Sequence, residues 1–274
     1  MRQPAIFQVD AYLDRLGLQS PPAPGEDSLE SLHRAHVYTV PFENFDIHLG
    51  RGISLDPADL FRKIVTGSRG GYCFELNGLF QQLLTALGYR VVTLLARVHV
   101  RGTPTARHHQ VSLVTINGRE WLADVGFGGN GLRASIPYEL NTIRSQDGIE
   151  FRLIDVPPWG TMLQVLENGE WKNLYSFSRE FVHAADIISG NFYTSTSPGS
   201  HFTWLRIAAL PNPEGKVTLV DFDLTVQTSD NTETITLQPG ATYLDIIREY
   251  FGINLQESYE KLSPLNQPPV LTGQ

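Results

Sequence analysis

The sequence predicts an α+β protein whose helices and strands are concentrated in different parts of the chain. Up to about residue 88, apolar residues recur at three- and four-residue steps, the pattern of helices that bury one face. From about residue 89 they alternate with polar residues and are often β-branched, which favours strands, and the last third mixes both patterns. We therefore expect a helical bundle at residues 1–88, a β unit of barrel or sandwich type at 89–190 and a mixed α/β region at 191–274.

The first two helices are predicted from their apolar faces and their ends. One covers residues 11–18 and stops before the prolines at 21–24. The next is expected to begin with Asp27 as its N-cap, because Glu30 three residues later would complete a capping box, and to end before Pro41.

The next two helices lead to the only cysteine of the chain. A helix should begin at Asp56, since Pro57 suits the first helical position. A longer helix should begin at Tyr72 or Cys73 and end at Gly88. The Cys73 thiol then lies beside unpaired N–H groups and the positive end of the helix dipole, which favours the reactive thiolate. A lone cysteine is often only a small buried apolar residue, so a nucleophile would also need a base nearby.

Strands are expected through the second part of the chain. The predicted strands are residues 90–100, 109–116, 119–125, 151–154, 161–166 and 171–175. The dipeptides Asn117-Gly118 and Asn168-Gly169 stand between two pairs of these strands and favour two-residue hairpin turns.

The last part should contain three more strands, one helix and a tail. The strands are predicted at residues 202–210, 217–224 and 232–237, and the helix at 242–250, ended by Gly252. The tail at 264–274 holds three prolines and is expected to be an extended strap over the surface.

Composition argues against several classes of function. The formal charge is -8, the pI is near 5.5 and basic runs are absent, which disfavours a nucleic acid or an anionic membrane as partner. A single cysteine excludes an intrachain disulfide and a cysteine-based zinc site, and no His-x-x-x-His pattern stands on a predicted helix. The apolar runs are short, and the first residues lack the apolar core of a signal peptide. We therefore expect a cytoplasmic protein without a metal.

The hairpin around Asn117-Gly118 selects a base for the cysteine. A two-residue turn sets Val111 opposite Asp124, and residues two apart on one strand share a face. His109 is then a diagonal neighbour of Asp124, at roughly 7–8 Å, whereas His108 points to the other face. The alternative is that histidine and carboxylate form no more than a satisfied polar pair at the end of a sheet.

Three further stretches carry candidate residues. Residues 126–131 contain four glycines, which let the backbone approach a ligand and expose N–H groups that suit phosphates. Residues 40–45 include a proline and two aromatic rings, and either close the helical core or line a binding site. Asp46 and His48 are an alternative polar pair, but no nucleophile lies near them in the sequence.

The motifs around these residues resemble the arylamine N-acetyltransferase family. The string RGGYCFELNGLF holds Cys73, and WLADVGFGG follows His109 and holds Asp124. VPFENFDIHL near the start and GNFYTSTSPGSHF at 190–202 are similar to two further family segments, so the resemblance covers nearly the whole chain. It implies a helical bundle, a central β-barrel and a C-terminal α/β lid joined by a helical interdomain segment, with a Cys-His-Asp core like that of cysteine proteases.

The resemblance also implies a reaction without a metal. Acetyl-CoA would acetylate Cys73, with His109 as base and Asp124 as its partner. An arylamine, an arylhydrazine or an N-arylhydroxylamine would then accept the acetyl group, as in xenobiotic metabolism. By analogy, the acceptor pocket would be lined by Phe42, Val98 and Phe127, and the CoA channel by Gly126, Gly128, Gly129 and Phe202.

Other readings of the same features stay open. A papain- or transglutaminase-type hydrolase also joins a cysteine at a helix start to a histidine and an acid, but gives its acyl group to water. An amide synthase of the same fold would act in a biosynthetic pathway, and a non-catalytic binding protein would not need the thiol. The segment 97–109 is short, and His108 stands where the family often has threonine or serine. The sequence predicts neither the physiological acceptor, nor the preferred acyl group, nor the oligomeric state.

Overall fold

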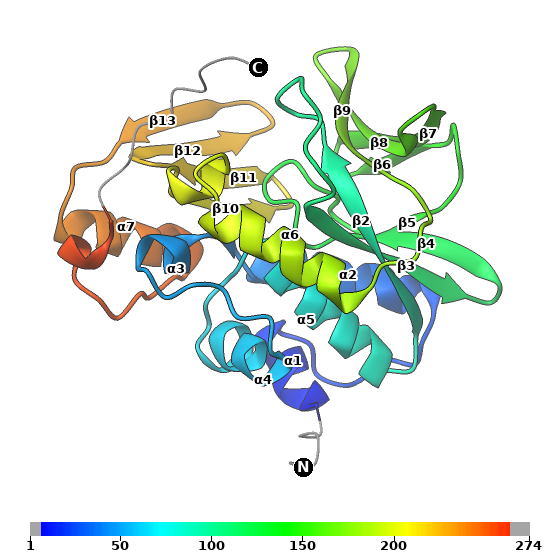
Figure 1. Ribbon diagram of the computed structural model, residues 1–274, viewed down its shortest axis with the longest axis horizontal. Coiled ribbons are helices and arrows are strands. Elements are labelled where there is room, and N and C mark those ends of the chain that lie inside the picture. Colours follow the sequence, from blue (N-terminus) through cyan, green and yellow to red (C-terminus); the bar gives the residue numbers. More distant parts are fainter. Residues whose placement is uncertain (1–6, 264–274) are drawn as a thin grey trace.

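The computed structural model describes residues 7–263, and the N-terminal part of the chain is helical as predicted (Figure 1). Its elements are α1 (Val9–Arg15), α2 (Glu26–Thr39), β1 (Phe42–Glu43), α3 (Phe45–His48), α4 (Pro57–Leu60), a π-helical stretch (Phe61–Thr66) and α5 (Cys73–Ala86). The apolar face predicted for α5 is inside, since Leu76, Leu79 and Leu83 are 0% exposed. α5 is therefore a core helix of this part, with the cysteine as its first residue.

The predicted helix starts are confirmed for two helices and wrong for one. The Asp56 carboxylate caps α4 by accepting the N–H of Ala58 at 2.9 Å, and α5 begins at Cys73. For α2, however, the N-cap is Gly25, and Asp27 lies inside the first turn. An acidic side chain in the first turn is favourable beside the positive helix end even when it caps nothing, so the sequence signal did not identify the cap itself.

Within residues 7–263, the middle of the chain forms a strongly curved antiparallel sheet of eight strands (Figure 1). In chain order they are β2 (Arg90–Val98), β3 (His109–Ile116), β4 (Arg119–Ala123), β5 (Ile136–Pro137), β6 (Ile143–Gln146), β7 (Ile149–Val156), β8 (Gly160–Glu167) and β9 (Glu170–Phe177). Their spatial order is β5-β4-β3-β2-β9-β8-β7-β6, and these described outer strands do not pair with each other, so the sheet is a near-barrel. Both predicted hairpins are confirmed, since Ile116 pairs with Arg119 and Glu167 with Glu170.

The last part adds a second sheet. Its elements are α6 (Ala184–Thr196), a 3₁₀ turn (His201–Thr203), β10 (Ile207–Asn212), β11 (Gly215–Val220), β12 (Asp223–Thr228), β13 (Thr232–Thr236), α7 (Ala241–Phe251) and a second 3₁₀ turn (Tyr259–Lys261). The strand order is β1-β10-β11-β12-β13, so a strand from the N-terminal part completes this sheet. The end of α7 at Gly252 is as predicted, because that residue has the left-handed φ of +66°.

Two strand predictions in this part were wrong in extent. The segment 202–210 begins as a 3₁₀ turn, and its strand starts only at Ile207. The segment 217–224 is not one strand, because it contains the hairpin turn between β11 and β12. Asp221 forms that turn with a φ of +56°, a conformation that aspartate adopts more readily than most residues. The tail predicted at 264–274 lies outside the described residues.

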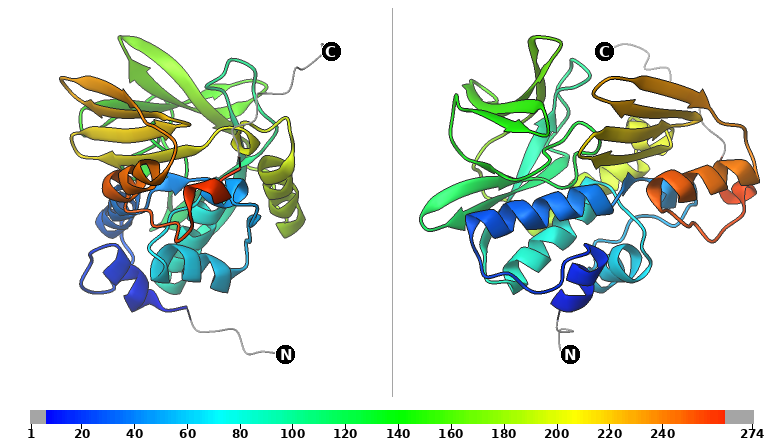
Figure 2. Two further views of the ribbon diagram at one scale, coloured as in Figure 1. Left: turned by 90° about the vertical axis from the view of Figure 1, so that its left-hand side faces the viewer. Right: turned by 180° about the vertical axis from the view of Figure 1, so that it is seen from behind.

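The two sheets stand side by side above the helical part, as the views in Figures 1 and 2 show. α6 packs on α5 so closely that a Cβ at Gly190 would lie 2.8 Å from the Phe74 ring. The predicted domain boundary between residues 190 and 191 falls within α6. The three-part division, with boundaries after residues 88 and 190, stays a prediction. Domain boundaries usually fall in linkers rather than inside a helix. No helix within residues 7–263 is long and apolar enough to cross a membrane.

Candidate active site

The cysteine lies at the start of α5 because the chain before it is held close to another segment. The Tyr72 N–H donates to Glu75 Oε2 at 3.0 Å, which closes the N-terminal turn of the helix. A Cβ at Gly70 would lie 1.9 Å from the Pro41 carbonyl oxygen, so only glycine fits there. Cys73 is 4% exposed, and its thiol donates to the His108 carbonyl oxygen at 3.7 Å.

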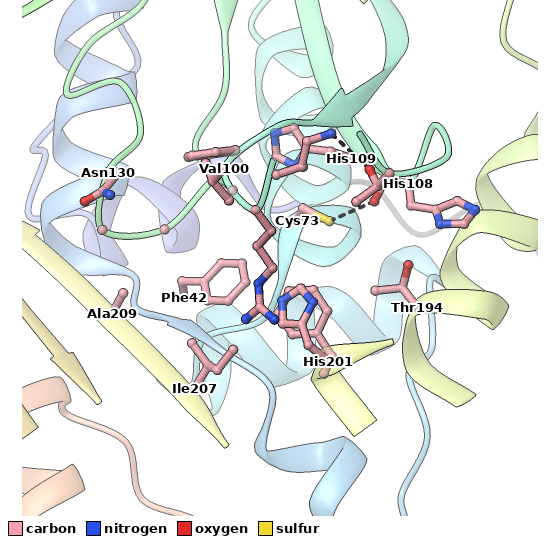
Figure 3. A pocket seen from close by; sticks show the side chains of 18 of the residues that line it. Phe42, Cys73, Val100, His108, His109, Asn130, Thr194, His201, Ile207 and Ala209 are labelled. Carbon is pink, nitrogen blue, oxygen red and sulfur yellow. Dashed lines mark hydrogen bonds between the residues drawn. The ribbon is translucent and has the colours of Figure 1, made fainter. Parts of the chain in front are cut away.

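The structure brings His109 and Asp124 together, as the hairpin register predicts. His109 Nε2 lies 2.7 Å from Asp124 Oδ2, and both side chains are buried. The His109 ring also packs edge-on against Phe127, with centroids 5.2 Å apart. His108 points away from Cys73 (Figure 3). Its ring lies against Tyr193 of α6, with ring centroids 4.6 Å apart. The prediction that His109, and not His108, lies beside Asp124 is therefore confirmed, and the role of His109 as base stays a prediction.

Asn77 and His33, which the sequence did not single out, help to hold the aspartate in place. Asn77 Nδ2 donates to Asp124 Oδ1 at 2.8 Å, and the Gly126 N–H donates to the same oxygen at 2.9 Å. The Asp124 N–H donates in turn to His33 Nε2 at 3.1 Å. Asn77 follows the cysteine by one helical turn and shares its face, which is a usable sequence signal. No local pattern points to His33, which comes from α2.

The charges of the pair stabilise each other. Burial opposes a charged imidazole, but the Asp124 carboxylate and the neighbouring Cys73 sulfur outweigh it and raise the pKa of His109 above its usual value. Burial likewise opposes the carboxylate, but His109 and the hydrogen bond from Asn77 keep the pKa of Asp124 below its usual range. Burial lowers the pKa of His33 to about 4, so this ring is neutral and can accept the Asp124 N–H.

The thiol opens into a cavity of about 960 Å³ between the near-barrel, the second sheet and α6 (Figure 3). All seven pocket and channel residues predicted from the resemblance line this cavity, namely Phe42, Val98, Gly126, Phe127, Gly128, Gly129 and Phe202. Their separate roles stay predictions. Further lining residues that the sequence did not single out for a role in the site include Arg101, Thr194, His201 and Lys216.

Two of the glycines have structural reasons to be glycine. A Cβ at Gly126 would lie 2.6 Å from Asn77 Nδ2 and 2.8 Å from the Cys73 Cα, so the loop after β4 can touch α5 only without a side chain. Gly128 has a φ of +86° and lies against the Phe42 ring. The two glycines thus let the loop lie directly against Cys73 and against Phe42.

The alternative pair Asp46 and His48 is not an active pair. The Asp46 carboxylate is bound by Lys63 at 2.8 Å and by Arg69 at 3.1 Å. His48 Nε2 lies 2.9 Å from the Leu205 carbonyl oxygen. Nowhere in residues 7–263 do three or more histidine, cysteine, aspartate or glutamate side chains gather as metal ligands would.

Comparison with known proteins places the chain among acetyltransferases. A model of the N-acetyltransferase family matches residues 27–259. An arylamine N-acetyltransferase / N-hydroxyarylamine O-acetyltransferase of Salmonella typhimurium is 34% identical over 253 residues, which are 90% of this chain and 89% of that protein.

Solved structures agree with this match. The arylamine N-acetyltransferase of Salmonella typhimurium superposes with a TM-score of 0.87 and 32% identity, over 93% of this chain and 96% of that one. The Mycobacterium marinum arylamine N-acetyltransferase, solved in complex with CoA, gives a TM-score of 0.87 and 34% identity over 93% and 97% of the two chains.

Proposed function

Because this chain belongs to the arylamine N-acetyltransferase family, we propose that it transfers an acetyl group from acetyl-CoA through a thioester on Cys73. The acceptor is the nitrogen of an arylamine or arylhydrazine, or the oxygen of an N-arylhydroxylamine. The protein is accordingly an acyltransferase of the EC 2.3.1 class. One observation carries the proposal: a buried His109–Asp124 pair at 2.7 Å lies beside the only thiol, at a cavity large enough for both substrates in turn.

In the first half-reaction the pair supplies a thiolate and then a proton. The pKa of His109 is raised, so its ring carries a proton, and this positive charge lies beside the sulfur of Cys73 that must attack as a thiolate. The sulfur attacks the thioester carbonyl carbon of acetyl-CoA, a new C–S bond forms, and the bond to the CoA sulfur breaks. His109 gives its proton to the departing CoA thiolate, which leaves as a thiol.

In the second half-reaction the same groups act in reverse. The amine nitrogen of the acceptor attacks the acetyl carbonyl carbon on Cys73, and neutral His109 takes the proton that this nitrogen loses. The C–S bond to Cys73 breaks, which restores the thiolate and the imidazolium. A cysteine suits this sequence because its thioester has an energy similar to that of the donor, so the acetyl group is stored rather than lost.

The pocket walls fit a flat aromatic acceptor. Phe42, Val98 and Phe127 present apolar surface to the cavity, and aromatic acceptors bind such walls. We assign the glycine-rich loop and Phe202 to the donor, because exposed backbone N–H groups suit phosphates. A reactive thiol must also stay reduced, which supports a cytoplasmic location.

The test follows CoA release with and without an acceptor. Acetyl-CoA alone should give one equivalent of free CoA and an acetylated Cys73 that mass spectrometry detects, and steady turnover should require an arylamine such as 4-chloroaniline or a hydrazine. Continuous CoA release without any amine would instead identify a hydrolase. A parallel series with propionyl- and malonyl-CoA defines the acyl preference, and failure of all simple acceptors would point to an amide synthase.

A further inference from the structure

The cavity around Cys73 is lined by cations and, within residues 7–263, by no carboxylate. Arg101 and Lys216 line it, in a protein whose formal charge is -8. Lys216 is half-buried on β11, and its Nζ donates to the side-chain oxygen of Asn130. A positive cavity in a negative protein does not follow from composition and indicates an anionic ligand.

A buried arginine lies behind the glycine-rich loop at this end of the cavity. Arg133 is 2% exposed, and no carboxylate within residues 7–263 forms an ion pair with it. The Asp147 carboxylate is near enough to raise the pKa of Arg133, but it is already bound by Arg34 at 2.6 Å. The guanidinium instead donates to the carbonyl oxygens of Gly131 at 3.1 Å and Gly129 at 3.0 Å, and its Nε has no partner among the described residues. Its positive charge is therefore not cancelled locally.

These contacts determine where the loop presents its N–H groups. The Gly131 N–H donates to the Gly128 carbonyl oxygen at 3.1 Å and closes a turn. The Gly129 carbonyl points to Arg133, and in a trans peptide the following N–H, that of Asn130, points the opposite way. The N–H groups of Gly129 and Asn130 donate to no acceptor within residues 7–263, and both residues line the cavity.

The turn lies directly against β11, so its N–H groups and the lysine are neighbours. A Cβ at Gly129 would lie 3.1 Å from Thr218 Cγ2 and 3.3 Å from Lys216 Cδ. Burial and the positive charge of Arg133 both lower the pKa of Lys216, because each disfavours a second cation there. A bound anion would relieve this repulsion.

We propose that Lys216, Asn130 and the N–H groups of the turn at 128–131 bind a phosphate group of the acyl donor, and that Arg133 is a positioning residue that holds the turn. This inference rests on the proposed function and names the donor-binding end of the cavity. In Figure 3, Asn130 lies on one side of Cys73, and His108 and Thr194 lie on the other.

The experiment compares two donors that differ in their phosphates. S-acetylpantetheine carries the same thioester arm as acetyl-CoA but no phosphate. Lys216→Met should raise the KM for acetyl-CoA about tenfold, the usual effect of losing one charge-assisted hydrogen bond, with kcat unchanged. Its KM for S-acetylpantetheine should not change. The matched control is Lys172→Met on β9, an exposed lysine paired with Glu170, which should leave both KM values unchanged.

Arg133 is tested by a pair of variants. Arg133→Met should raise the KM for acetyl-CoA but not that for S-acetylpantetheine, and Arg133→Lys, which keeps the charge, should restore part of the difference. Thermal unfolding checks that each variant folds. Because Arg133 is buried, a variant that does not fold is set aside, and Lys216→Met alone then decides.

A binding measurement makes the inference independent of catalysis. Calorimetric titration with inorganic pyrophosphate should show tighter binding to the unmodified protein than to Lys216→Met. Equal binding, or an equal rise in KM for both donors, would overturn the proposal. So would a higher KM for an aminobenzoate acceptor with an unchanged KM for acetyl-CoA, because the anion would then be the acceptor carboxylate. If the protein transfers acetyl from neither donor, the proposed function fails, and the titration still tests the phosphate site.

Discussion

Two groups of buried ionisable side chains flank the start of α5. They differ in the number of oppositely charged partners that each side chain has. On one side, Arg69 binds Glu43 at 2.6 Å and Asp46 at 3.1 Å, and Lys63 binds Asp46 at 2.8 Å and Glu75 at 2.8 Å. On the other side, His109 has a single carboxylate partner, Asp124 at 2.7 Å, and lies beside the Cys73 sulfur.

The difference shows how similar groups serve structure in one place and chemistry in the other. In this network Arg69 and Lys63 are each bound by two carboxylates, so removing either cation leaves a buried carboxylate unpaired. In the proposed reaction, the imidazolium of His109 faces a thiolate whose charge disappears when the sulfur is acetylated. His109 can therefore lose its proton during the reaction while Asp124 stays held by Asn77 and the Gly126 N–H. This comparison makes four predictions.

Removing the thiol should have the largest effect on activity and almost none on stability. Cys73→Ala should lower acetyl transfer on the order of 10⁴-fold or more, because no acetyl-enzyme can form. Its unfolding temperature should stay close to that of the unmodified protein. Normal transfer by this variant in a CoA-release assay would show that the acetyl group does not pass through Cys73, and that the His109–Asp124 pair does not act on this cysteine.

The two adjacent histidines should differ sharply. His109→Ala should lower kcat by about 10³- to 10⁴-fold, since the general base and the partner of the thiolate are lost together. His108→Ala, the matched control, should stay within about tenfold because the His108 ring, although it lines the cavity, lies against Tyr193 and not against Asp124. Steady-state kinetics of both variants decide the matter, and the reverse result would mean that the wrong histidine has been assigned.

Breaking the structural network should affect stability more than chemistry. Arg69→Met leaves the buried Glu43 without a cation, while Asp46 keeps Lys63, and should cost about 3–5 kcal/mol of unfolding free energy. The control Arg62→Met removes an exposed pair with Asp59 and should cost less than about 1 kcal/mol. Denaturant unfolding measures both. If Arg69→Met kept full stability and lost activity, the network would belong to the catalytic machinery.

The smallest effect is the pH dependence of stability that the pair contributes. The pKa of Asp124 is lowered by folding, so its contribution is present above about pH 4, the unfolded value, and is lost as the pH falls below it. The pKa of His109 is raised, so its contribution is full below about pH 6.5, declines above it and is gone once the pH passes the raised pKa. The stability gap between the unmodified protein and Asp124→Asn should therefore be widest between about pH 4 and 6.5. A gap that does not vary with pH would mean that the pair is not charged.

The sequence predicted the parts of the site that local geometry determines. The Asn117-Gly118 turn has only one common register, and that register placed His109 beside Asp124 before any long-range contact was known. The start of α5 could be predicted from the two glycines before it and from the spacing of its apolar residues. The position of the thiol at the start of the helix could therefore be predicted as well.

The remaining parts depend on contacts between distant segments. His33 reaches Asp124 across 91 positions of sequence, and its role follows only from how α2 packs below the near-barrel. The charge of Arg133 becomes informative only once the structure shows that no acid of the described chain pairs with it. The missed turn at Asp221 has a different cause, because an aspartate in an apolar run gives a weaker turn signal than glycine or asparagine-glycine.

The strand β1 has a consequence for how the protein is made. β1 pairs Phe42 with Ala209 and bridges to Gly71, two residues before the nucleophile, and both paired residues line the cavity. Contacts between such distant residues form late, after the large loop between them has closed. On the ribosome the thiol emerges long before β10 does, so the nascent chain carries a cysteine whose pocket lacks a wall. A cavity with all of its walls is therefore expected only after β10 has been made and has paired with β1.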